Sequence, residues 1–211
     1  MLMKLKKIIY ILISLFTLGG CSASYKELSN MEENKPSNFQ EYLLQEYKKR
    51  ATFEAEEMHD WNSAKLYSEK ALKSLKTDKI YPEKISYWKL PENNVDEIRI
   101  AYDNLMIVYK DAKIKDPYSL AKAISSLDCW SEQQEENWQS WDINRCKEDF
   151  LNSMHNIYKK ISAIEENKSS INDDDDDKFE NILEDEVTVV TKDKNNGLMQ
   201  IIYFDFDKYN L

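Results

Sequence analysis

Very few residues in this chain would interrupt a helix. Only three glycines and four prolines occur among its 211 residues. A fold of many short strands needs glycine and proline at its turns, whereas long helices do not. Hydrophobic residues make up 42% of the chain and charged residues 32%, which suits a folded helical domain better than a disordered chain. We therefore predict an all-α protein.

Apolar residues recur at steps of three or four residues, as they do along the buried face of a helix, in five segments. These segments are 39–58, 64–75, 95–112, 120–127 and 143–164. Asn94, Asp116 and Asp142 are candidate N-caps of the last three helices. Pro117 suits the first position of the helix that follows Asp116. We expect residues 38–165 to form one bundle of about five helices.

The second of these segments resembles the second helix of a tetratricopeptide repeat. Ala64 and Ala71 stand at the small positions that allow two helices to pack closely, and Trp61 stands at the aromatic position. The resemblance covers about half a repeat, and no second copy follows 34 residues later. It implies a single TPR-like helical hairpin rather than a repeat array.

The first 20 residues have the character of an export signal. Three lysines lie among the first seven residues, and residues 8–18 form an apolar run that is too short to span a membrane. Two glycines and Cys21 follow, which resembles the bacterial lipobox, where a peptidase cuts before a diacylglyceryl-modified cysteine. The resemblance implies that Cys21 is the lipid-carrying N-terminus of the mature protein. The alternative is an ordinary secretory signal followed by a chance cysteine.

The charge of the chain restricts its partners. The formal net charge is −10, whereas nucleic-acid binding and adhesion to anionic lipid both need a basic surface. We therefore expect no nucleic-acid partner and membrane attachment only through the lipid on Cys21. Ser22 follows the cysteine, which by resemblance to the enterobacterial sorting rule implies the outer membrane, facing the periplasm. Residues 21–37 are polar and are predicted to be a lipidated tether.

The other two cysteines lie near helix ends. Cys129 is near the end of the fourth predicted helix and Cys146 near the start of the fifth, so an antiparallel pair of helices would bring them together. An exported protein meets an oxidising compartment, where such a disulfide would contribute about 3 kcal/mol. A reactive or metal-binding thiol pair is the alternative, but His59 and His155 are the only histidines and neither is near in sequence.

The C-terminal part changes in composition. Residues 166–184 are predicted to be a solvated acidic linker. Four acidic residues there have the spacing of calcium ligands in an EF-hand, but Lys178 stands where that loop needs glycine; the four are Asp173, Asp175, Asp177 and Glu184. Residues 185–211 contain two apolar runs around Asn196-Gly197 and are predicted to form a short β-hairpin or an orphan strand.

The last ten residues, IYFDFDKYNL, resemble the first strand of an OmpA-like peptidoglycan-binding domain, with Tyr209 in place of the usual serine. Two longer segments resemble the helical domain of alphaproteobacterial OmpA-family outer-membrane lipoproteins. They are EAEEMHDWNSAKLYSEKAL at 54–72 and DCWSEQQEENWQSWDINRC at 128–146. The Asp and Arg with which the family grips peptidoglycan lie on later elements, and no LSxxRA-like motif is present. The resemblance implies a truncated or split member with no peptidoglycan-binding residue of its own.

Enzyme motifs are not found in the sequence. It contains no nucleophile elbow, HExxH motif, glycine-rich phosphate loop or CxxC pair. Glu132, Glu135 and Glu136 could form a carboxylate site, but glutamates at this density more often form a solvated helix face; three tryptophans lie nearby, Trp130, Trp138 and Trp141. We expect no catalytic residue, no metal ligand and no cofactor.

These observations together predict a non-enzymatic, lipid-anchored envelope protein. Its periplasmic helical domain would be a structural or protein-interaction module, with another envelope protein as a possible partner. The alternative is a tether between the outer membrane and peptidoglycan whose binding half is lost or encoded elsewhere.

Overall fold

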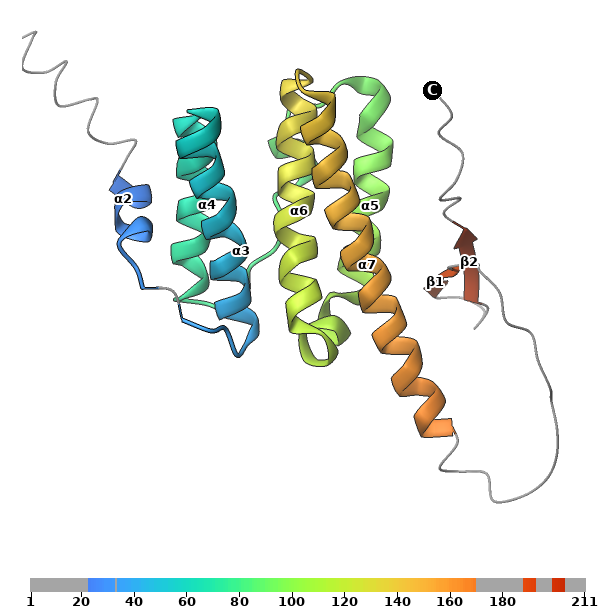
Figure 1. Cartoon of the computed structure of the whole chain (residues 1–211). Helices are drawn as coiled ribbons and strands as arrows, with labels where there is room; N and C mark the ends of the chain where they lie inside the picture. Colours follow the sequence, from blue (N-terminus) through green and yellow to red (C-terminus); the bar gives the residue numbers. More distant parts are fainter. Residues whose placement is uncertain (1–22, 33, 170–187, 193–198, 204–211) are drawn as a thin grey trace, which may run out of the picture.

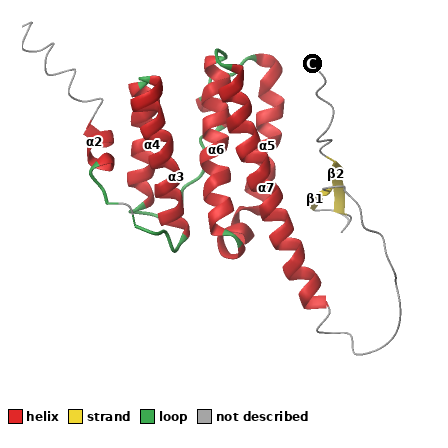
Figure 2. Cartoon of the chain, viewed as in Figure 1, coloured by secondary structure: helices red, strands yellow, loops and turns green. Residues whose placement is uncertain are grey.

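The computed structural model describes residues 23–32, 34–169, 188–192 and 199–203 (Figure 1). The long described segment is helical, as Figure 2 shows, and this part confirms the all-α prediction. The elements in chain order are α2 (Ala23–Ser29), α3 (Phe39–Phe53), η1 (Glu54–Met58), α4 (Trp61–Ser74), η2 (Ile85–Tyr87), α5 (Glu92–Lys115), α6 (Pro117–Glu136), α7 (Ser140–Ser169), β1 (Thr188–Lys192) and β2 (Met199–Tyr203). The two strands pair antiparallel, with Val190 opposite Ile201. The predicted export signal, Cys21, most of the acidic linker and Asn196-Gly197 lie outside the described residues.

The helices α3 and α4 pack side by side as the predicted hairpin. Asn38 caps α3 by accepting a hydrogen bond from the backbone N–H of Glu41 at 3.1 Å. The chain leaves α3 through η1, a single π-helical turn, and reverses at His59, whose φ of 58° is left-handed. Ala64 and Ala71 are fully buried on α4, which allows the close packing that small side chains permit.

The helix α6 lies at the centre of the bundle. It packs against α3, α5 and α7, and Figure 1 shows it beside α5 and α7. It carries more buried side chains than any other described helix, and its Trp130 packs on Phe150 of α7 at 6.0 Å between ring centroids. Burying each such apolar side chain stabilises the fold by about 1.5–3 kcal/mol. The bundle is therefore organised around α6.

Two predicted helix starts are three residues too late. The helix α5 begins at Glu92, directly after Pro91, rather than near Asn94, because proline holds an extended backbone that leads into a helix. The helix α7 begins at Ser140, so Asp142 lies in its first turn instead of capping it. The prediction for α6 is confirmed, since Asp116 accepts a hydrogen bond from the N–H of Ser119 at 3.2 Å and Pro117 is the first helical residue.

The prediction of a tether over residues 21–37 is wrong for residues 23–31. This segment contains α2, which packs against α3 and α4. Leu28 is fully buried. The Tyr25 ring meets Trp61 edge-on at 6.1 Å, and its hydroxyl donates to Glu56 at 2.8 Å. A helix of seven residues shows too few turns for its apolar face to stand out in a polar segment.

Asp128 is the centre of a buried polar network. This side chain on α6 is fully buried and accepts hydrogen bonds from the Tyr47 hydroxyl at 2.6 Å and the Lys70 ammonium at 2.5 Å. The backbone N–H of Glu83 donates to its other oxygen at 2.7 Å. Asp128 therefore joins α3, α4 and the segment before η2 to the central helix.

Cys129 and Cys146 lie at disulfide-bonding distance where α6 and α7 run antiparallel, with Cα atoms 5.6 Å apart. The pairing is the predicted one, but α6 continues to Glu136 and α7 begins at Ser140, so both cysteines lie within these helices rather than at their ends. Arg50 of α3 lies beside it, and its guanidinium donates to Ser126 at 3.1 Å and to Asp149 at 3.2 Å. The cysteine pair therefore joins α6 to α7, and Arg50 joins α3 to the same place in the bundle.

Candidate functional site: a carboxylate cluster at one end of the bundle

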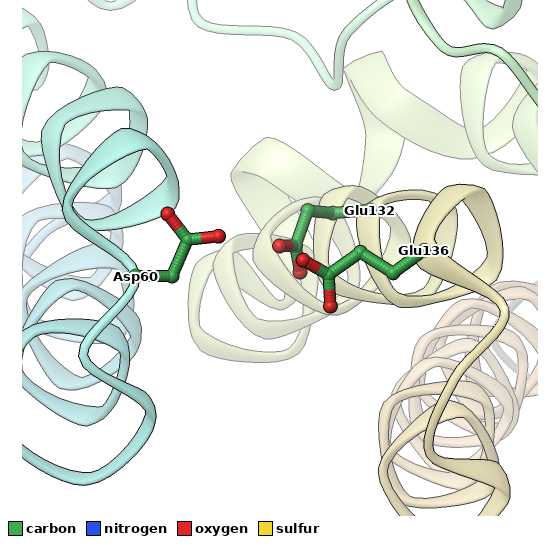
Figure 3. A group of neighbouring side chains, drawn as sticks. All are labelled: Asp60, Glu132 and Glu136. Atoms are coloured by element: carbon green, nitrogen blue, oxygen red, sulfur yellow. The ribbon is translucent and has the colours of Figure 1, made fainter.

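Three carboxylates converge where the α3–α4 and α6–α7 turns meet. One oxygen each of Asp60, Glu132 and Glu136 lies within 4.8 Å of the others. We call these three side chains the carboxylate cluster. Figure 3 shows the two glutamates side by side on α6 and Asp60 facing them from the turn before α4. The cluster therefore brings together residues about 70 positions apart in the sequence.

Local structure explains how each member is placed. Glu132 and Glu136 are four residues apart, so they lie on the same face of α6. Asp60 is the N-cap of α4, and its Oδ1 accepts from the N–H groups of Asn62 at 2.7 Å and Ser63 at 3.1 Å. The left-handed residue Asn137, with φ of 50°, ends α6 directly after Glu136. Both turns that carry the cluster are thus fixed by helix-end geometry.

Hydrogen bonds orient Glu132, the most buried member. The Ser63 hydroxyl donates to one carboxylate oxygen at 2.6 Å, and the Gln133 amide donates to the other at 2.8 Å. Burial nevertheless raises the pKa of Glu132 to about 7, and the nearby charge of Glu136 adds to this effect. The pKa of Glu136 is also raised, by partial burial and by Asp60.

Two further acids stand around the cluster. Glu54 of η1 is only 2% exposed, and burial raises its pKa to about 8, with the charges of Glu132, Asp142 and Asp60 contributing in that order. Asp142 is buried at the start of α7, and burial raises its pKa although Arg145 forms an ion pair with it at 2.5 Å. The end of the bundle thus holds five acids that repel one another.

The Tyr67 hydroxyl is buried next to this group without a hydrogen-bond partner among the described residues. Tyr67 lies one helical turn after Ser63 on α4, so it is on the face that meets Glu132. Burial raises the pKa of Tyr67 well above its usual range, and the charges of Glu132 and Glu54 raise it further. A fully buried hydroxyl without a partner is costly and indicates a group that it could bind.

The predicted carboxylate site is found only in part. Glu132 and Glu136 come together, whereas Glu135 is not a member of the cluster. Trp130 is a core residue, and Trp138 and Trp141 are exposed. Sequence reasoning missed Asp60, Glu54 and Asp142. The five acids come from segments far apart in the sequence, and no local spacing pairs those segments.

The arrangement suits cation or proton binding. Its donors are carboxylate and hydroxyl oxygens, the ligands that hard divalent cations prefer.

Within the described part of the chain, no helix is long and apolar enough to cross a membrane. Comparisons with protein-family models, with curated proteins and with solved structures give no match.

Proposed function

We propose that this protein is a lipid-anchored protein of the bacterial envelope whose helical domain binds a helix of another envelope protein and catalyses no reaction. The observation that carries the proposal is a stripe of isoleucines on α5. Ile100, Ile107 and Ile114 are 48%, 55% and 83% exposed. They are spaced seven residues apart, so they lie along one line of the helix. We call these three residues the isoleucine stripe.

A helix with an apolar seam fits the isoleucine stripe. The stripe supplies one of the two apolar positions per heptad that line the contact between packed helices. Each isoleucine buried in such a contact would gain about 1.5–3 kcal/mol. The exposed neighbours Asp103 and Lys110 supply the polar rim that surrounds apolar contacts between proteins. A partner helix with apolar residues at heptad spacing is therefore the ligand that this surface favours.

The position of α2 supports anchoring close to the membrane. This helix begins at Ala23, two residues after Cys21, and Leu28 fixes it to the bundle. A lipid on Cys21 would therefore hold the domain against the membrane surface with almost no free chain between them. Exposed Trp61 and Trp138 lie near the same end of the bundle, since they flank Asp60 and Glu136 of the carboxylate cluster. Tryptophan favours the interface between membrane and water.

A photo-crosslinking amino acid at position 107, in cells that make the lipidated chain, tests the proposal. We expect one discrete cross-linked product, whose partner peptide maps to an amphipathic helix. Ile114→Lys should reduce that product at least tenfold, because it places a charge in the stripe. Asn144→Lys, an equal charge change at an exposed position of α7, should leave it unchanged. No product, a product insensitive to Ile114→Lys, or a cross-link only between two copies of this chain would contradict the proposal.

A further inference from the structure

We propose that Asp60, Glu132 and Glu136 bind a single calcium ion that joins the α3–α4 turn to the C-terminal end of α6. The geometry fits the size of the ion. Calcium holds oxygens at about 2.3–2.6 Å, so oxygens on opposite sides of it lie about 4.6–5.2 Å apart. The three cluster oxygens lie within 4.8 Å of one another, which calcium can bridge with little movement of the side chains.

Magnesium fits the same oxygens less well. It needs near-octahedral geometry and gives up its water molecules reluctantly, so three protein carboxylates suit it less well than they suit calcium. Asp60 is tied to two backbone N–H groups and Glu132 to Ser63, which limits how far these carboxylates can close. Glu136 is exposed, so water has access to complete the coordination of a calcium ion.

Buried groups beyond the three ligands point independently to a bound cation. Glu54 is only 2% exposed. Its largest charge interactions are with Glu132, Asp142, Asp60 and Glu136, so it faces the cluster. The Tyr67 hydroxyl is fully buried without a partner on the face of α4 that meets Glu132. One divalent cation would compensate the repulsion among these acids.

The ion would also link the two turns. Arg145 is the basic side chain paired with the acids at this end, and it binds Asp142 rather than the cluster. Asp60 and Glu136 come from different hairpins, so a shared ion would cross-link the α3–α4 hairpin to the α6–α7 hairpin. Calcium would then stabilise the relative position of the two hairpins.

The test measures the unfolding temperature of the full chain in non-ionic detergent against CaCl₂ after treatment with a chelator. We expect a saturable rise with half-saturation on the order of 0.1–1 mM, the range of extracellular calcium modules, and a clearly weaker response to MgCl₂. Asp60→Asn keeps the N-cap, because asparagine caps as well as aspartate does. It should weaken calcium binding at least tenfold, as should Glu136→Gln.

Each variant is compared with a matched control, Glu135→Gln, which changes the neighbouring glutamate outside the cluster and should keep the wild-type response. Without calcium, Glu136→Gln should unfold at the same or a higher temperature than the wild type, because it removes repulsion. Loss of the calcium response therefore cannot be confused with loss of folding. Absence of a saturable response in the wild type, an equal response to MgCl₂, or the same response in all variants would overturn the proposal.

Discussion

At the scale of single residues, Glu54 affects the stability of the fold through the burial of its carboxyl group. The fold places its carboxyl group in a nearly water-free position beside other acids, and its pKa rises to about 8. A buried carboxylate without a hydrogen-bonded counter-charge is expensive, so the folded state favours the protonated form. The position therefore links the stability of the protein to pH and, if the ion binds, to calcium.

The pH dependence follows in sign from this shift. Without divalent cations, the unfolded chain releases the Glu54 proton above pH 4.5, its usual pKa, whereas the folded chain keeps it up to about 8. This part of the stability is therefore lost as pH rises through the window, by about 3 kcal/mol at pH 7. Glu54→Gln should remove this contribution and leave the smaller one of Glu132, whose pKa is also raised. Urea unfolding of both proteins in EDTA between pH 5 and 8 measures it.

Glu57→Gln is the matched control, because Glu57 is exposed in the same π-helical turn. The control should follow the wild type at every pH. If Glu54→Gln and the wild type lose stability in parallel as pH rises, Glu54 is not held protonated in the fold.

At the scale of elements, the bundle is joined by polar contacts as well as by its apolar core. Asp128 and Lys70 are both buried, and they connect α6 to α4. Glu83, which lies just before η2, also pairs with Lys70, at 2.9 Å. Breaking a buried ion pair by removing one partner is strongly destabilising, whereas replacing both partners with apolar groups costs much less.

Asp128→Asn should therefore lower the free energy of unfolding by about 3 kcal/mol, because Lys70 would keep its charge with only Glu83 to balance it. The double variant Asp128→Asn with Lys70→Met should recover part of this loss. Equilibrium urea unfolding measures both. A change in the single variant of less than about 0.5 kcal/mol, the size of an ordinary surface substitution, would show that the network contributes little.

The same elements show what local sequence signals can predict. The start of α6 was predictable because Asp116 and Pro117 each have a local role, and the α3–α4 break because the apolar spacing stops near His59. The helix α2 was not predictable from local sequence, because its burial depends on contacts with α3 and α4. The pairing of Glu132 and Glu136 was suggested by their spacing. Asp60 joins them only through packing of distant segments, which periodicity does not report.

At the scale of the whole molecule, one end of the bundle combines several features of the proposal. The helix α2 begins there, close to Trp61, and the carboxylate cluster lies beside it. The isoleucine stripe lies on α5, a helix that carries no member of the carboxylate cluster. A chain anchored through Cys21 would thus place the cluster near the membrane and leave the stripe available to a partner helix.

The most direct test of this account is the intact mass of the mature protein, isolated from bacterial membranes, and of its N-terminal peptide. The account predicts an N-terminus at Cys21 that carries a diacylglyceryl group, and Cys21→Ser should abolish this product and its incorporation of labelled palmitate. A mature chain with an unmodified Cys21, or one that begins at another residue, would contradict the account.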